Sequence, residues 1–191
     1  MILKEKNKAC FLDRDGVINV EKNYVHRVED LVVYDETYKA IALLRDRGFK
    51  VIVITNQGGV AKGYYKEQDV FAVHTELDKL LAARDLCIDA YYYCLHHPGG
   101  IIKKYAMDCD CRKPAPGMIL RAARDLNIDL SSSFMVGDKM SDIKASINAG
   151  CLGILVKTGH GFEHIESAVK KGIIIKENIL DAVRYFIENK M

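Results

Sequence analysis

The sequence lacks any apolar run long enough to cross a membrane. Its longest apolar stretches are short, such as Val51–Ile54, whereas a membrane-spanning helix needs about 20 residues. The N-terminal segment Met1–Lys8 has no apolar signal-peptide core. We therefore expect no membrane partner and a cytoplasmic location.

The sequence also has little excess charge and no repeat. Lys and Arg number 28 and Asp and Glu 26, which gives a formal net charge of +2. So balanced a charge argues against a nucleic-acid or anionic-membrane partner. A length of 191 residues is within the usual size of one domain with its own core. We expect a single domain spanning residues 1–191, and a monomer.

The six cysteines are not expected to form disulfides. Without an export signal a reducing compartment is favoured, where clustered cysteines more often bind metal. Cys10, Cys87 and Cys151 occur singly in apolar stretches, and we expect all three to be buried.

Apolar periodicity predicts alternating strands and helices. Strands are expected at residues 9–13, 50–55, 88–93, 133–136, 152–156 and 173–175. Helices are expected at residues 36–47, 66–84, 116–126, 139–149, 162–170 and 179–188. This alternation predicts an α/β fold with a single doubly wound parallel sheet, covered by helices on both faces.

Acidic residues follow two of the predicted strands. Asp13 and Asp15 follow the first, while Asp138 and Asp142 follow the strand at 133–136. Ligands of such sheets bind outside the carboxyl ends of the strands, and close carboxylates repel unless a cation lies between them. Hard oxygen ligands suit Mg(II). The alternative is that these residues form turns and cap helices.

Candidate phosphate-binding donors lie in two further segments. Thr55, Asn56, Gln57 and Gly58 end a predicted strand with hydroxyl, amide and backbone N–H groups, and Arg112–Lys113 supplies two cations. Phosphoryl transfer depends on neutralising negative oxygens. The alternatives are a polar loop and two solvated cations.

Cys94, His96, Cys109 and Cys111 form two closely spaced pairs. Four such ligands from one loop, residues 94–111, suit a closed tetrahedral structural Zn(II) site. His97 is a weaker candidate ligand. Zinc would order Arg112 and Lys113, which follow the last ligand. The alternatives are four metal-free side chains or, less favoured, a redox pair of cysteines.

Together these motifs resemble those of the haloacid-dehalogenase-like phosphatases. Phe-Leu-Asp13-Arg-Asp15-Gly, Thr55-Asn-Gln, Lys113 before Pro-Ala-Pro-Gly-Met, and Gly-Asp138-Lys-Met-Ser-Asp142 occur in that family's order over residues 11 to 142. The resemblance implies that Asp13 is the nucleophile and Asp15 the general acid and base.

The resemblance also implies how ligands are held. Asp13, the backbone carbonyl of Asp15 and Asp138 would bind Mg(II), and Thr55 and Lys113 would stabilise the phosphoryl group. Asp142 would support this site or cap a helix. A phosphatase of this kind with a zinc-bound loop would have no large cap domain.

The cysteine loop resembles the zinc-containing branch of the family, which includes D-glycero-D-manno-heptose 1,7-bisphosphate 7-phosphatases and histidinol-phosphate phosphatases. Twelve residues separate His96 from Cys109, a loop length similar to that of the heptose enzymes. The resemblance implies removal of the 7-phosphate through an aspartyl-phosphate, in heptose biosynthesis for lipopolysaccharide or other surface glycans. The expected contacts to this sugar phosphate are Glu21, Lys22, Asn23, Tyr24, Thr55, Asn56, Gln57, Gly58, Arg112, Lys113 and Lys139.

Three points stay open. Lys62 stands where heptose enzymes usually carry arginine, which leaves the preferred anomer undecided because lysine lacks the bidentate fork. Histidinol phosphate is the alternative substrate. A non-catalytic zinc-stabilised binding module is a more remote alternative, and the intact Asp13 and Asp15 argue against it. A nucleotide-binding oxidoreductase is disfavoured because no Gly-x-Gly-x-x-Gly follows the first strand.

Overall fold

The computed structural model describes residues 6–190, so residues 1–5 of the Met1–Lys8 segment lie outside it. Its described part contains one six-stranded sheet in which all pairings are parallel, in the order β3-β2-β1-β4-β5-β6. The strands are β1 (Ala9–Leu12), β2 (Lys50–Asn56), β3 (Ala90–Cys94), β4 (Phe134–Gly137), β5 (Leu152–Val156) and β6 (Ile174–Lys176).

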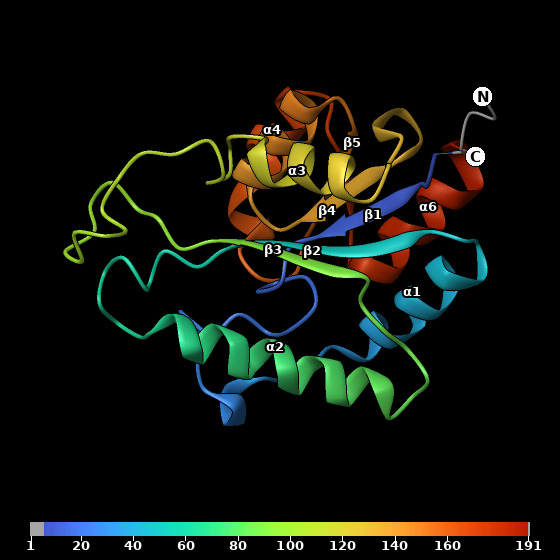
Figure 1. Cartoon of the computed structure of the whole chain (residues 1–191). Coiled ribbons are helices and arrows are strands. Elements are labelled where there is room, and N and C mark those ends of the chain that lie inside the picture. Colours follow the sequence, from blue (N-terminus) through green and yellow to red (C-terminus); the bar gives the residue numbers. More distant parts are fainter. Residues whose placement is uncertain (1–5, 191) are drawn as a thin grey trace, which may run out of the picture.

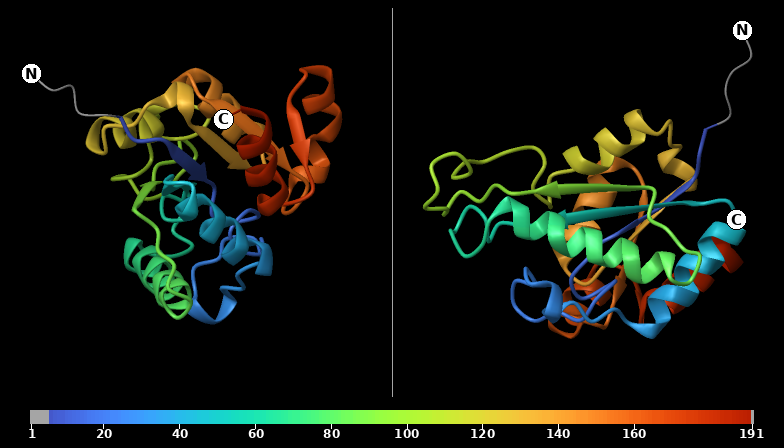
Figure 2. Two further views of the ribbon diagram at one scale, coloured as in Figure 1. Left: turned by 90° about the vertical axis from the view of Figure 1, so that its right-hand side faces the viewer. Right: turned by 60° about the horizontal axis from the view of Figure 1, so that its bottom comes forward.

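Helices cover both faces of this sheet (Figures 1 and 2). One face packs against α1 (Asp35–Asp46), α2 (Glu67–Ala82) and α6 (Ile179–Lys190). The other packs against α3 (Gly117–Asp125) and α4 (Met140–Ala149), with α5 (Ile165–Lys170) beside α4 and β5. The predicted doubly wound α/β fold is confirmed. Within residues 6–190, no helix combines the length and apolarity needed to span a membrane.

The central strand β1 explains why both faces need covering. All four of its residues are buried. Cys10 and Leu12 point into the core beneath α1, α2 and α6, whereas Ala9 and Phe11 point into the core beneath α3 and α4. A strand that is buried on both faces is typical of a parallel sheet.

Element boundaries differ from the sequence prediction by a few residues, and three short 3-10 helices were not anticipated as such. They are Val28–Asp30, Leu130–Ser132 and Gly161–His164, the last forming the start of the helix predicted at 162–170. The expectation for Cys87 is wrong, because its side chain is exposed. Its neighbours Leu86 and Ile88 pack on the core, so the residue between them faces outward. Cys10 and Cys151 are buried as expected.

The strand order places a topological switch between β1 and β4. The chain proceeds outward from β1 to β3 and then returns to lay β4 on the other side of β1. Leu12 pairs with Val136, and the Asp13 amide donates to the Val136 carbonyl at 3.0 Å. The residues that follow β1 and β4 are therefore level with each other, at the edge where such folds bind ligands.

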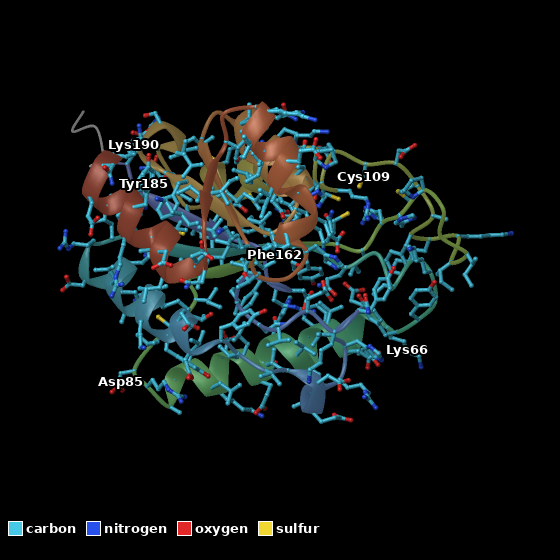
Figure 3. The ribbon with its side chains drawn as sticks, turned by 180° about the vertical axis from the view of Figure 1, so that it is seen from behind. Lys66, Asp85, Cys109, Phe162, Tyr185 and Lys190 are labelled. Atoms are coloured by element: carbon cyan, nitrogen blue, oxygen red, sulfur yellow. The ribbon has the colours of Figure 1, made fainter. Side chains whose placement is uncertain are left out.

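The long loops emerge from this same edge. In Figure 1 the segments that follow β2 and β3 extend together beyond the strand ends, on the side away from both chain termini. Figure 3 shows Cys109 and Lys66 at this end of the molecule, with Asp85 and Lys190 at the opposite end.

Candidate active site

A buried lysine joins acids from two strand ends. Lys113 Nζ lies 2.9 Å from Asp13 Oδ1 and 2.7 Å from Asp142 Oδ1, and it donates to the Ile54 carbonyl at 2.8 Å. Burial alone would lower the pKa of Lys113, but the two carboxylates raise it above its ordinary value. Lys113 is therefore a fixed positive charge beside Asp13.

Three carboxylates outnumber this single buried cation. Burial raises the pKa of Asp13 to about 6, although Lys113 opposes that rise. Burial, followed by the charges of Asp13 and Asp142, raises the pKa of Asp138 to about 8. Both shifts mean that the protein alone does not neutralise this cluster. A divalent cation would remove the repulsion.

The oxygen atoms of this cluster fit a hard metal ion. One carboxylate oxygen from each of Asp13, Asp138 and Asp142 lies within 4.8 Å of the others. Asp138 Oδ1 is buried and has no hydrogen-bond partner among residues 6–190, whereas Asp138 Oδ2 accepts the His160 amide at 2.9 Å. One oxygen of Asp138 is thus anchored and the other is available, as a Mg(II) ligand requires.

Asp142 already has partners for both oxygens. Its Oδ1 pairs with Lys113, and its Oδ2 accepts the Lys139 amide at 2.9 Å at the start of α4. Asp142 therefore caps α4 and holds Lys113.

Two glycines allow Asp138 to sit between neighbouring loops. A Cβ on Gly16 or on Gly159 would lie 2.3 Å from Asp138 Oδ2, which no side chain could tolerate. Both residues also have positive φ, +84° and +58°, where glycine carries no steric penalty. Thr158 Oγ1 donates to the Gly16 carbonyl at 2.6 Å and links the two loops.

The Asp15 side chain is held by groups outside the carboxylate cluster. Arg14, which is fully buried, donates from Nη2 to Asp15 Oδ1 at 3.1 Å and Oδ2 at 2.9 Å. Asn19 Nδ2 donates to Oδ1 at 3.0 Å, and Gln57 Nε2 to Oδ2 at 3.2 Å. Burial would raise the pKa of Asp15, but these donors, Arg14 first, hold it below its ordinary value. Asp15 is ionised in the unliganded protein.

The end of β2 and the residue that follows it contribute to the site in two ways. Gln57 Nε2 also donates to Thr55 Oγ1 at 2.9 Å, which orients the buried Thr55 hydroxyl. Asn56 forms a pair of hydrogen bonds with the backbone of Lys113, both at 3.1 Å. These bonds fix the loop that carries Lys113 against β2.

A cleft of about 380 Å³ opens over these residues. It is lined by Asp13, Asp15, Thr55, Lys113, Asp142 and Lys62, and by every predicted substrate contact except Lys22, which is exposed and lies outside it. Four further lining residues were not predicted from the sequence as part of the site: Tyr65, His97, Ser141 and His160. Among these, His160 could have been found by the same rule that identified Asp138, because it closely follows β5.

The rim of the cleft is charged and conformationally strained. Lys139 Nζ lies 3.4 Å from Glu21 Oε2, and Lys62 Nζ donates to Tyr24 Oη at 2.9 Å. Asn23 and Tyr24 both have positive φ, 54° and 70°, a backbone region that costs non-glycine residues energy and recurs at ligand-binding sites. The segment predicted to face the sugar is therefore held in an unusual conformation.

The four predicted zinc ligands come together beside this cleft. Cys111 Sγ lies 3.1 Å from both Cys94 Sγ and Cys109 Sγ, and His96 Nδ1 lies 3.4 Å from Cys111 Sγ. The Cys94–Cys109 and Cys94–His96 separations are 3.5 and 3.8 Å. Tetrahedral Zn–S bonds of about 2.3 Å place sulfur atoms about 3.8 Å apart, so the cluster is compact enough for one zinc ion.

His97 is not part of this cluster. Its Nδ1 accepts the Gly99 amide at 3.0 Å, and its ring lines the cleft. Arg112, which directly follows the last cysteine, donates from Nη1 to the His96 carbonyl at 3.1 Å. This hydrogen bond connects the cysteine loop to Arg112, one of the two cations predicted to contact substrate.

Known proteins share both the sequence and the fold. Residues 110–182 match the family model described as HAD-hyrolase-like. The D-glycero-beta-D-manno-heptose-1,7-bisphosphate 7-phosphatase of Pasteurella multocida is 41% identical over 91% of this chain and 94% of its own. The protein of the same name from Escherichia coli K12 is 43% identical over 79% of this chain and 80% of its own.

A solved structure extends this similarity to three dimensions. The D,D-heptose 1,7-bisphosphate phosphatase of B. bronchiseptica, crystallised with magnesium and phosphate, superposes with a TM-score of 0.85 at 31% identity, covering 95% of this chain and 98% of that one. Identities above 40% along most of both chains establish common membership. The chain belongs to the family of the D-glycero-beta-D-manno-heptose-1,7-bisphosphate 7-phosphatases, within the HAD-like hydrolases.

Proposed function

We propose that this protein is a Mg(II)-dependent phosphatase that removes the 7-phosphate of D-glycero-D-manno-heptose 1,7-bisphosphate. The observation that carries the proposal is the buried Lys113, held between Asp13 and Asp142 at the switch point of the sheet. The names of the relatives supply the substrate. Because those names specify the beta anomer, we propose the same anomer here.

Asp13 and Asp15 divide the chemistry between them. A carboxylate oxygen of Asp13 attacks the phosphorus, and the bond to the heptose oxygen breaks as Asp15 gives that oxygen a proton. Asp15 then takes a proton from a water molecule, whose oxygen attacks the aspartyl-phosphate and releases phosphate and free Asp13. A bound phosphate dianion next to Asp15 favours its protonated form before the first step.

Charge stabilisation comes from groups fixed before substrate arrives. Lys113 and the Thr55 hydroxyl face the phosphoryl oxygens, and both are buried and already oriented by hydrogen bonds. Preorganised donors of this kind act on charge that develops in the transition state. Asp13, Asp138 and the Asp15 carbonyl would hold Mg(II), which supplies neutralisation of the transferring phosphoryl group. The buried Asp138 Oδ1, which has no hydrogen-bond partner in the described residues 6–190, supports this assignment.

The cysteine loop is proposed to orient substrate. Zn(II) bound by Cys94, His96, Cys109 and Cys111 would fix the adjacent Arg112, whose planar guanidinium suits the second phosphate. Glu21, Asn23, Tyr24 and Lys139 line the rim of the cleft and would contact the sugar. Lys62 would add a point charge at the same rim, and its ammonium is already bonded to Tyr24.

A phosphate-release assay tests the proposal. Both anomers of the bisphosphate, histidinol phosphate and a generic sugar monophosphate are compared with Mg(II) present and after chelation. We expect the beta bisphosphate to have the highest kcat/KM and Asp13→Asn to abolish turnover while fold and zinc content persist. A preference for histidinol phosphate, or full activity of Asp13→Asn, would overturn the proposal.

We further propose that the protein acts as a cytoplasmic monomer without nucleic-acid or membrane partners. The near-neutral net charge of +2 and the cysteine cluster suited to metal in a reducing compartment support this assignment. Light scattering at micromolar concentration tests the oligomeric state, with a mass close to the chain's 21.5 kDa expected.

A further inference from the structure

The buried Tyr65 is linked to Asp15, the proposed general acid, by hydrogen bonds through the side chain of Gln57. Tyr65 is only 7% exposed, and its hydroxyl donates to Gln57 Oε1 at 2.8 Å. The amide nitrogen of Gln57 donates in turn to Asp15 Oδ2 at 3.2 Å and to Thr55 Oγ1 at 2.9 Å. Tyr65 lies eight positions after Gln57 and belongs to none of the family motifs in the sequence.

The direction of each hydrogen bond follows from chemistry. The oxygens of Asp15 already accept hydrogen bonds from Arg14 and Asn19, and Gln57 likewise turns its NH₂ group toward Asp15 and its carbonyl oxygen toward the Tyr65 hydroxyl. Burial raises the pKa of Tyr65 well above its ordinary value, so its hydroxyl keeps the proton it donates. The Tyr65 hydroxyl therefore favours the one amide orientation that serves Asp15.

The position of Tyr65 is itself closely determined. Its ring stacks on His26 with centroids 4.9 Å apart and planes inclined by 6°. A Cβ on Gly59 would lie 2.2 Å from a ring carbon of Tyr65, so glycine at that position makes room for the ring. The other donors to Asp15, Arg14 and Asn19, come from the nucleophile loop. Gln57, the residue directly after β2, donates from a different segment of the chain.

We propose that Tyr65 is a positioning residue for phosphoryl transfer, holding the Gln57 amide so that Asp15 is aimed at the leaving oxygen. This inference rests on the proposed role of Asp15 as proton donor. Loss of the Tyr65 hydroxyl should therefore lower turnover by an amount that depends on the leaving group of the substrate. An alkoxide leaving from a sugar needs the proton, whereas p-nitrophenolate departs with little help, since acid catalysis matters most for poor leaving groups.

The test compares two substrates in the zinc- and Mg(II)-loaded protein. For Tyr65→Phe, which keeps the ring, we expect kcat on the heptose bisphosphate to fall about tenfold with KM within about twofold, as suits the loss of one hydrogen bond. On p-nitrophenyl phosphate, kcat should fall less than about threefold. Tyr64→Phe is the matched control, because it removes a phenol from the adjacent, 59% exposed residue, and should change neither rate.

A double-substitution cycle separates positioning from packing. Gln57→Met keeps the length of the side chain and removes the amide that contacts both Asp15 and Thr55. We therefore expect turnover of both substrates to fall, and that of the heptose bisphosphate to fall further. Adding Tyr65→Phe to Gln57→Met should then cost little more, because Tyr65 acts through Gln57. Equal losses on both substrates, a change in KM alone, or additive effects would overturn the inference. If Tyr65→Phe fails to fold, Gly59→Ala, which displaces the ring, is compared in the same way.

Asp15→Asn distinguishes failure of this inference from failure of the proposed function. It should reduce turnover of the bisphosphate far more than turnover of p-nitrophenyl phosphate. If Asp15→Asn shows that dependence and Tyr65→Phe does not, Tyr65 has no positioning role and the proposed function stands. If Asp15→Asn lacks the dependence, Asp15 is not the proton donor, and both proposals lose their basis.

Discussion

His74 should make the protein lose stability in mild acid. It lies in α2 with its ring stacked on Tyr91, 4.4 Å between centroids, and its Nε2 is buried without a hydrogen-bond partner within residues 6–190. Burial, followed by the nearby charge of Arg14, lowers the pKa of His74 from 6.5 to about 3. The folded protein therefore holds this imidazole neutral, while the unfolded chain can protonate it.

The sign and size of the effect follow from linkage. A histidine whose folded pKa is depressed contributes its full stability above pH 6.5, and that contribution is lost as the pH falls from 6.5 toward 3. At pH 5 the unfolded state gains about 2 kcal/mol from protonation that the folded state cannot match. Phenylalanine at position 74 keeps an aromatic ring against Tyr91 and removes the titration.

Urea unfolding of the original protein and of His74→Phe between pH 5 and pH 7.5 measures this effect. We expect the difference in unfolding free energy to move by about 2 kcal/mol in favour of His74→Phe as the pH falls. Other titrating groups cancel in the difference. His164→Phe, at a partly exposed position, is the control for replacing a histidine by phenylalanine outside α2. A difference that stays constant with pH would show that His74 is not held neutral.

Two substitutions test the metal sites. Gly159→Ala should weaken Mg(II) binding at least tenfold by titration calorimetry, because its methyl would displace Asp138. The control is Gly172→Ala, also at positive φ but with open space around it, which should bind Mg(II) normally. Equal affinity in the two variants would contradict the proposed role of Asp138. Cys111→Ser should lower the zinc content measured by elemental analysis. It should also reduce kcat/KM more than tenfold, because Lys113 would lose its fixed position. A zinc-free variant that stays active would count against an ordering role for zinc.

The fold could be predicted because its signals are local. The six strands and the helices between them each carry their own apolar period, and parallel pairing follows from the alternation. Asp13 and Asp138 could be placed together for the same reason, since both follow strands and the carboxyl ends of parallel strands share one edge. The close spacing of Cys94 with His96 and of Cys109 with Cys111 likewise indicates a metal site without knowledge of the fold.

Side-chain partnerships across the chain could not be predicted in this way. The sequence gives no sign that Asp142 holds Lys113, because 29 positions separate them and Lys113 lies in an aperiodic loop. Tyr65 comes just before a helix and has no local mark of its bond to Gln57. Cys87 was wrongly expected to be buried, because an apolar neighbourhood does not reveal which way a single side chain turns.

The contact between Gly16 and Gly159 has a consequence for how this site could change. Thr158 binds the loop after β1 to the loop after β5, and Asp138 is enclosed between two glycine backbones. A side chain introduced at either glycine would collide with Asp138, so neither glycine can be replaced without moving this carboxylate. Asn23 and Tyr24, by contrast, border the cleft with exposed side chains. New substrate preferences can therefore arise at that border while the reacting centre is inherited unchanged.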